Sequence, residues 1–102
     1  MTNYNFDELI DHVIEWARER DLLHDDYANR QMLKVVEEVG ELSSAIAKNS
    51  YDDIIDGIGD SYVTLIILGA QLGISPNEAL SAAYDEIKNR TGKTKGGVFI
   101  KD

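Results

Sequence analysis

The chain has 102 residues, a hydrophobic share of 43% and a formal net charge of −9. We expect a single domain over residues 1–102, because this length leaves no room for two hydrophobic cores. The absence of cysteine excludes disulfides and thiolate metal sites, and it favours the reducing cytoplasm as the location. The acidic charge argues against a nucleic acid polymer as partner. No apolar stretch reaches the ~20 residues of a membrane span, so we expect no membrane partner either.

The charge is unevenly distributed along the chain. Residues 88–101 contain five basic residues and no acidic one, whereas the preceding 87 residues contain five basic and eighteen acidic residues. An acidic body with a basic tail suits a metal site beside a phosphate-binding strip. The alternative is a solvated tail that only offsets electrostatic repulsion.

The first half of the chain predicts two helices. The first spans residues 6–20, with Asn5 as its N-cap and Glu8 three residues later. Its apolar residues recur at helical spacing. The second spans residues 27–48 and ends at Asn49 and the serine that follows.

The second half predicts two further helices and a tail. The third helix spans residues 52–73, with acidic residues at its start and glycine at its end. The fourth spans residues 75–90, because Ser75 is an N-cap, proline follows it, and Glu78 completes a capping box. The apolar triplet at residues 98–100 predicts a brief strand or an arm packed on a neighbour.

These elements predict an all-α fold. No segment shows sustained alternation of apolar and polar residues, so we expect no sheet. Four helices joined by short loops predict a four-helix antiparallel bundle that oligomerisation completes, followed by a short extended C-terminal tail.

The predicted second helix carries three acidic residues close together on one side. Glu37, Glu38 and Glu41 fall within an arc of roughly 100°, opposite an apolar stripe. On one helix alone, this pattern is typical of a solvent-exposed surface.

The predicted third helix strengthens the case for a functional site. It is apolar around nearly all of its circumference, which predicts that it is buried. Asp56 and Asp60 lie one turn apart on its narrow polar stripe. Two like charges on a central helix repel each other, and each is costly to desolvate without a partner. A divalent cation would relieve this repulsion.

We therefore predict a metal site between these two helices. Its ligands would be Glu37, Glu38, Glu41, Asp56 and Asp60. All-oxygen ligands suit Mg²⁺, with Mn²⁺ as a substitute, and the isolated His12 and His24 are expected at the surface. The ions would bind a polyphosphate and activate a water, and Glu37 or Glu38 would be the catalytic residue that accepts its proton.

Three segments also carry a resemblance to a known family. The chain resembles the MazG-like group of all-alpha nucleoside triphosphate pyrophosphohydrolases in KVVEEVGEL, DGIGDSYVTLIILGAQLGIS and AAYDEIKNRTGK, and the similarity covers most of the chain from about Trp16. The family pattern is a lysine before Glu-Glu-x-x-Glu, then Glu-x-x-Asp on the next helix. The matching residues are Lys34, Glu37, Glu38, Glu41 and Asp60. Where the family has the first acid of the second motif, this chain has Gly57, and Asp56 is the expected substitute.

The resemblance implies an activity and further site residues. It implies Mg²⁺-dependent cleavage of a nucleoside triphosphate between the α and β phosphates, by a homodimer or homotetramer whose site is shared between subunits. The implied phosphate-binding residues are Lys34, Lys88, Arg90 and Lys93, with Lys95 as a further candidate. The family often has an asparagine one turn before a lysine of the last helix, where this chain has Asp85. Trp16 either stacks on the nucleobase or packs at the edge of the core.

Several functional alternatives stay open. One is a hydrolase of the same superfamily that is specific for dUTP or a modified nucleotide. Another is a nucleotide- or metal-binding regulatory module without turnover. A third is a helical oligomerisation domain with acidic surfaces. No motif identifies the preferred base.

Overall fold

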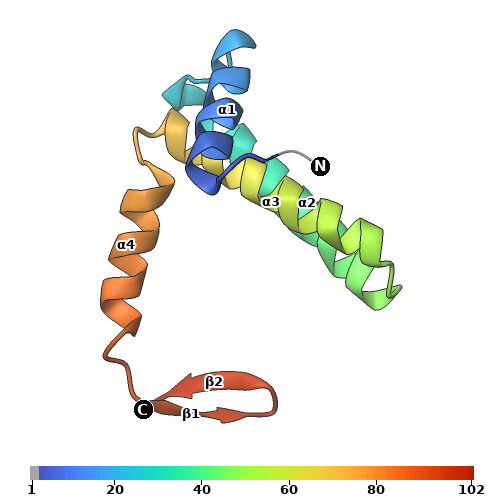
Figure 1. Ribbon diagram of the computed structural model, residues 1–102, viewed down its shortest axis with the longest axis vertical. Helices are drawn as coiled ribbons and strands as arrows, with labels where there is room; N and C mark the ends of the chain where they lie inside the picture. Colours follow the sequence, from blue (N-terminus) through green and yellow to red (C-terminus); the bar gives the residue numbers. More distant parts are fainter. Residues whose placement is uncertain (1–2) are drawn as a thin grey trace.

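The computed structural model describes residues 3–102 (Figure 1). Its elements are α1 (Phe6–Glu19), the 3-10 turn η1 (Asp25–Tyr27), α2 (Ala28–Ala47), α3 (Tyr51–Gln71), α4 (Pro76–Ile87), β1 (Gly92–Lys95) and β2 (Val98–Lys101). The four predicted helices are confirmed, with ends within about three residues of those expected. Both predicted N-caps are also confirmed. The Asn5 side chain accepts from the Glu8 backbone N–H at 2.9 Å, and the Ser75 hydroxyl accepts from that of Glu78 at 3.0 Å.

The expectation that the chain has no sheet is wrong at the C-terminus. Strands β1 and β2 pair as an antiparallel hairpin in which Gly92 lies opposite Lys101. The turn consists of Gly96 and Gly97, with φ of 57° and 80°. Two consecutive positive φ angles suit a two-residue hairpin turn, and glycine adopts them without strain. The four-residue strands are too short to show a clear alternation in the sequence.

Helices α2 and α3 form an antiparallel pair, and α1 packs across α3 (Figure 1). The two helices pack closely where Gly57 meets Leu42, since a Cβ at Gly57 would lie 3.1 Å from the Cα and Cβ of Leu42. Further along, the Gln31 side chain donates to the Thr64 carbonyl at 3.1 Å. The buried apolar residues cluster at these contacts: Ala17, Val35, Ala45, Ile66 and Ile67.

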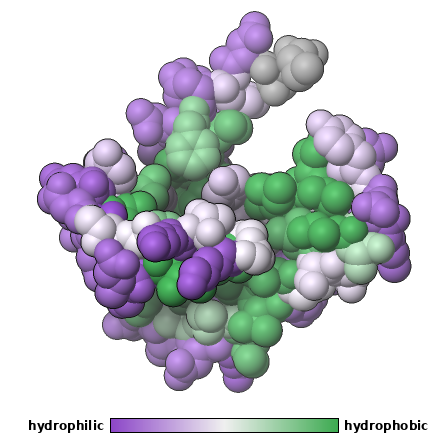
Figure 2. All heavy atoms as spheres, turned by 90° about the horizontal axis from the view of Figure 1, so that it is seen from below, coloured by the Kyte–Doolittle hydropathy of each residue, from purple (hydrophilic) through white to green (hydrophobic). Residues whose placement is uncertain are grey.

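The prediction that the third helix is buried all round is wrong for a single chain. One face of α3 packs on α2, but large apolar residues on the rest stay exposed. They include Ile55, Ile58, Tyr62 and Leu65, which are 43–54% exposed. Helices α1 and α2 cover only part of α3, and of these four side chains Tyr62 meets the Phe6 ring of α1 edge to face, at 6.1 Å between the ring centroids. Figure 2 shows broad apolar areas left uncovered on the face seen from below.

The described residues of one chain do not form a four-helix bundle by themselves, and the bundle completed by oligomerisation stays a prediction. Helix α4 leaves α3 at a bend of 102° and carries the hairpin away from the other helices (Figure 1). Gly73, with φ of 74°, lies in the turn that ends α3 and redirects the chain. The radius of gyration is therefore 15.9 Å, against about 13 Å for a compact chain of this length.

In residues 3–102, no single helix combines the length and apolarity that a membrane crossing requires. Helices α3 and α4 reach that threshold only when they are taken together, as a pair with the 102° bend between them.

Candidate functional site

An open acidic groove lies between α2 and α3. It encloses about 390 Å³, and its lining residues are Glu41, Ser44, Ala45, Lys48, Asp53, Asp56, Gly57 and Asp60. Both predicted aspartates and one predicted glutamate are therefore brought together. The groove lies along the contact between α2 and α3. In this contact Gln31 lies beside Thr64, and Leu42 lies beside Gly57.

Glu38 lies at the contact between the two helices, next to this groove. Its side chain is half-buried, and this burial raises the pKa of its carboxyl above the ordinary value. The negative charges of Glu41 and Asp60 raise this pKa further, as do a hydrogen bond with Glu41 and the charge of Glu37. The structure thus places three predicted acids, Glu41, Asp60 and Glu37, within electrostatic reach of a fourth, Glu38.

This repulsion predicts a pH-dependent stability in the absence of divalent cations. Because the folded-state pKa of Glu38 lies above its unfolded value, folding favours the protonated form. The resulting stability is present below the unfolded pKa and is lost as pH rises through the raised pKa. We expect Glu38→Gln to raise the melting temperature at pH 7 in EDTA, with the difference from wild type shrinking toward pH 4. Glu19→Gln, at the exposed end of α1, is the control. A lower melting temperature for Glu38→Gln at pH 7 would contradict the electrostatic account.

The expectation that Asp56 and Asp60 lie on a buried helix is wrong for the single chain. Asp56 and Asp60 are exposed, so they do not carry the desolvation cost that a buried helix would impose. Within residues 3–102, no three His, Asp or Glu side chains are arranged as the ligands of one ion. Glu37 instead accepts a hydrogen bond from Lys34 at 3.4 Å. The metal-binding roles of the five acids stay predictions.

Position 57, where the family resemblance would expect an acid, has little room for one. Gly57 is buried where α3 packs closely on α2, so any side chain there would press on the Leu42 backbone. The neighbouring Asp56 lines the groove. Asp56 as the substitute acid stays a prediction.

A second, apolar pocket lies on another part of α3 and shares no lining residue with the acidic groove. It encloses about 300 Å³ between α1 and α3, and its lining residues are Leu9, His12, Val13, Trp16 and Val63. Val63 follows Asp60 by three residues, so it lies on the same side of α3, about 5 Å further along the helix. The Trp16 ring is 47% exposed, and the Arg20 guanidinium lies 4.2 Å from its centroid.

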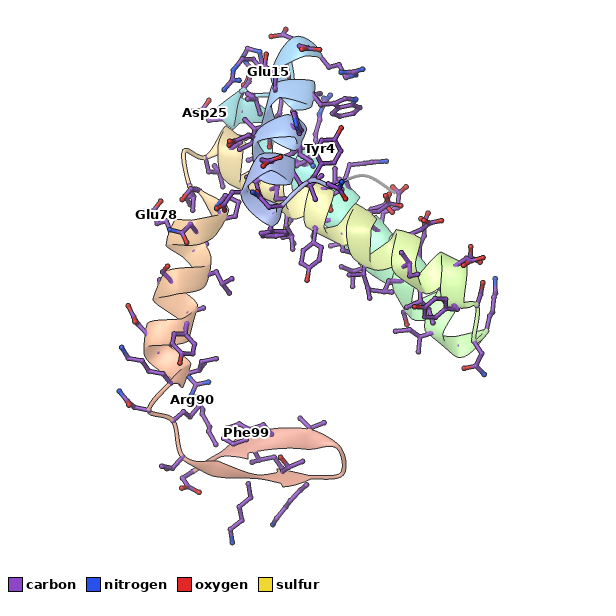
Figure 3. All side chains as sticks on the ribbon, in the orientation of Figure 1. Tyr4, Glu15, Asp25, Glu78, Arg90 and Phe99 are labelled. Atoms are coloured by element: carbon purple, nitrogen blue, oxygen red, sulfur yellow. The ribbon has the colours of Figure 1, made fainter. Side chains whose placement is uncertain are left out.

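The predicted phosphate-binding residues are divided between two places. Lys34 is on α2, beside the acids. Lys88 and Arg90 follow the end of α4, and Lys93 is on β1, so these three lie away from the groove of their own chain (Figure 3). Lys88 pairs with Asp85 at 3.1 Å and Arg90 with Glu86 at 3.3 Å.

The sequence prediction missed three groove residues. Asp53, Ser44 and Lys48 line the acidic groove with the predicted acids. Ser44 and Lys48 follow Glu41 by three and seven residues, which is the spacing of one helix face. Ser44 and Lys48 could therefore have been predicted by extending the acidic face of α2 toward its C-terminal end. Both histidines are exposed as predicted, although His12 also lines the apolar pocket.

Comparison with known proteins gives a partial match. The chain is 44% identical over 64 residues to an uncharacterized 18.2 kDa protein in the rep-hol intergenic region of Haemophilus phage HP1. The match covers 63% of this chain and 39% of that protein, so the chain spans well under two thirds of the relative's length. No protein-family model matches the chain, and no solved structure matches it. The function must therefore be argued from the site itself.

Proposed function

We propose that this protein is a Mg²⁺-dependent nucleoside triphosphate pyrophosphohydrolase of the MazG-like type. It would cleave its substrate between the α and β phosphates and release a nucleoside monophosphate and pyrophosphate. The observation that carries the proposal is that α3 contributes to both a groove lined by carboxylates and an apolar pocket edged by Trp16, with Asp60 of the groove and Val63 of the pocket three residues apart. A nucleotide has the same two parts, a polyphosphate that binds metal and a planar base.

The donor set of the groove fits a hard divalent cation. Glu41 and Asp60 lie close enough to Glu38 to raise the pKa of its carboxyl. Asp56 lines the groove together with Glu41 and Asp60. These oxygen ligands suit Mg²⁺ or Mn²⁺, and both helices keep the side chains solvent-accessible. When bound, such an ion would neutralise phosphate charge and lower the pKa of an attacking water.

The remaining groups of the site have separate tasks. Glu38 would accept the proton of the attacking water at its carboxylate, and its raised pKa suits a general base better than that of an ordinary glutamate. Glu37 is the alternative base. Lys34 precedes the three glutamates of α2 along the chain, and Lys48 follows them. Both lysines would contact phosphate oxygens.

The apolar pocket would hold the nucleobase. One face of the Trp16 ring faces the Arg20 guanidinium, and the ring's exposed surface offers an area for stacking. His12 and Trp16 are the lining residues with ring nitrogens that can hydrogen-bond, the imidazole as donor or acceptor and the indole N–H as donor. We propose a homodimer or homotetramer as the working form, because the exposed apolar face of α3 needs a covering surface.

A substrate screen tests the proposed function. The full chain is incubated with Mg²⁺ and each of the canonical (deoxy)nucleoside triphosphates, dUTP and modified nucleotides, and pyrophosphate is detected. We expect release from at least one of them, with EDTA abolishing it. If nucleotides raise the melting temperature but none is cleaved, the protein is a binding module rather than an enzyme.

Trp16 gives a separate prediction for the base pocket. Stacking of a base on an aromatic ring is worth roughly 1–3 kcal/mol, so Trp16→Ala should raise KM about tenfold or more while kcat changes little. Trp16→Phe should keep most of the affinity. Steady-state kinetics on the best substrate measure both. An unchanged KM for Trp16→Ala would assign Trp16 to packing at the edge of the core.

A further inference from the structure

The positive charge of the chain is concentrated at its C-terminal hairpin. Residues 88–102 contain five basic residues and one acidic residue, a net charge of +4, whereas residues 1–87 contain five basic and eighteen acidic residues, a net charge of −13. Lys93, Lys95 and Lys101 of the hairpin are exposed, and among residues 3–102 none of the three has a salt-bridge partner. The hairpin therefore presents three cations to a partner.

The structure also separates this hairpin from the acidic part of the chain. Together α4 and the hairpin form a C-terminal arm, residues 76–102, with the hairpin at its far end (Figure 1). A helix of 12 residues, such as α4, is about 18 Å long. The Debye length at physiological ionic strength is about 8 Å, so exposed charges at this separation are largely screened from one another. The net charge of the whole chain therefore does not argue against a polyanion at the hairpin.

The strand register divides the side chains of the hairpin between two faces. Side chains alternate along a strand, so Thr94, Phe99 and Lys101 share one face. The other face carries two lysines and two aliphatic residues: Lys93, Lys95, Val98 and Ile100. Because cations lie beside apolar side chains on both faces, neither face is the continuous apolar surface that docking into a lipid bilayer needs. A nucleic acid strand, which combines phosphates with aromatic bases, matches this mixture better.

The Phe99 ring is positioned as a stacking surface (Figure 3). It lies against the paired strand, where its Cζ would be 2.6 Å from a Cβ built at Gly92, so only glycine leaves room for it. The residue is 51% exposed. At the open end of the hairpin the Thr91 hydroxyl donates to the Asp102 carboxylate at 2.8 Å, and the Asp102 N–H donates to the Thr91 carbonyl at 3.0 Å. These contacts hold the two strands together beneath the ring.

We propose that this hairpin binds single-stranded nucleic acid. A base stacks on the Phe99 ring, and the adjoining phosphate contacts Lys101 on the same face. The hairpin is only two strands wide, about 5 Å, so the nucleic acid can pass the edge of β1 and bring further phosphates to Lys93 and Lys95. This binding uses no residue of the acidic groove and does not depend on the proposed function.

Fluorescence anisotropy of a labelled 15-nucleotide oligo(dT) tests the binding with the full chain. The buffer contains EDTA, so that no divalent cation links phosphate to the acidic groove. We expect binding at 50 mM salt, with log K falling against log salt at a slope of about −2, since each of three neutralised phosphates contributes about −0.7. A duplex of the same length should bind more weakly, because its bases are already stacked on each other. Oligo(U) in place of oligo(dT) tells whether RNA is bound as well as DNA. Absence of binding, or equal binding of the duplex, would overturn the proposal.

Charge variants test the role of the lysines. The double variant Lys93→Gln and Lys95→Gln should weaken binding about tenfold or more and reduce the slope to about −0.7. The double variant Arg18→Gln and Arg30→Gln removes the same charge from exposed positions of α1 and α2, and it should bind like the wild type. Equal losses in the two double variants would overturn the proposal, because they would reflect net charge alone.

Variants of Phe99 test the stacking. Phe99→Leu keeps an apolar side chain beside Gly92 but removes the aromatic ring, and it should weaken binding about fivefold or more. Phe99→Tyr keeps the ring and should bind like the wild type. Unchanged binding by Phe99→Leu would overturn the stacking. Sedimentation with phosphatidylserine-containing vesicles is the last arm: binding to these vesicles, but not to the oligonucleotide, would assign the hairpin to a membrane surface and overturn the proposal.

Discussion

Replacing Asp60 with asparagine is expected to lower kcat for pyrophosphate release by on the order of a hundredfold or more. Asp60 lies across the helix pair from Glu38, and its charge contributes to the raised pKa of that carboxyl. Asparagine keeps the size of the side chain but removes the negative charge that a hard cation requires. The measurement is steady-state kinetics with saturating Mg²⁺ and the best substrate of the screen.

The matched control is Asp52→Asn, in the first turn of α3 and outside the lining of the groove. It should keep near wild-type turnover. Because Asp60 is exposed, Asp60→Asn should leave the helical circular dichroism unchanged, and its melting temperature in EDTA should equal or slightly exceed that of wild type, since the variant removes part of the repulsion on Glu38. Turnover of Asp60→Asn within about threefold of wild type would exclude the acidic groove as the metal site.

Gly57→Asp is expected to destabilise the fold by about 3–5 kcal/mol, the cost of an unpaired charge in a buried position. This variant restores an acid at the family's position, but its Cβ would lie 3.1 Å from the Leu42 backbone. Gly57→Ala is expected to cost less. Overpacking of about 1–3 kcal/mol is partly offset by about 1 kcal/mol of helix propensity. Urea unfolding measures the free energies.

Gly40 provides the control, because no heavy atom lies within 4 Å of a Cβ built on it. Gly40→Ala should stabilise α2 by roughly 0.5–1 kcal/mol. Wild-type stability for Gly57→Asp would mean that α2 and α3 separate easily. In that case the placement of the acid at Asp56 would have no structural cause.

The local features of the fold could be predicted from the sequence because they depend on neighbouring residues. Asn5 and Ser75 cap their helices as expected, each by accepting a hydrogen bond from a backbone N–H three residues later. The hairpin was missed because Gly96 and Gly97 were not interpreted as a two-residue turn. That signal is present in the sequence.

The long-range features could not be predicted in the same way. The apolar circumference of α3 indicates that the whole helix needs covering, but it does not say whether α4 of the same chain or another molecule covers it. The bend after Gly73 decides this, and it leaves Ile55, Ile58 and Leu65 exposed. The close packing of Gly57 on Leu42 likewise depends on how α2 and α3 pair, which the sequence of one helix cannot show.

The candidate site was predicted in part. Glu41, Asp56 and Asp60 line one groove, because two antiparallel helices joined by a short loop bring their facing sides together. The metal-binding roles of the five acids stay predictions. The separation of Lys88, Arg90 and Lys93 from those acids could not be foreseen, since it follows from the direction of the arm.

The most direct test of the acidic groove as a pyrophosphohydrolase site is ³¹P NMR of the substrate incubated with the protein and Mg²⁺. The account predicts that the three triphosphate resonances are replaced by those of pyrophosphate and a nucleoside monophosphate, and that Asp60→Asn leaves the triphosphate intact. Formation of a nucleoside diphosphate and orthophosphate, or the same products from Asp60→Asn at the wild-type rate, would contradict it.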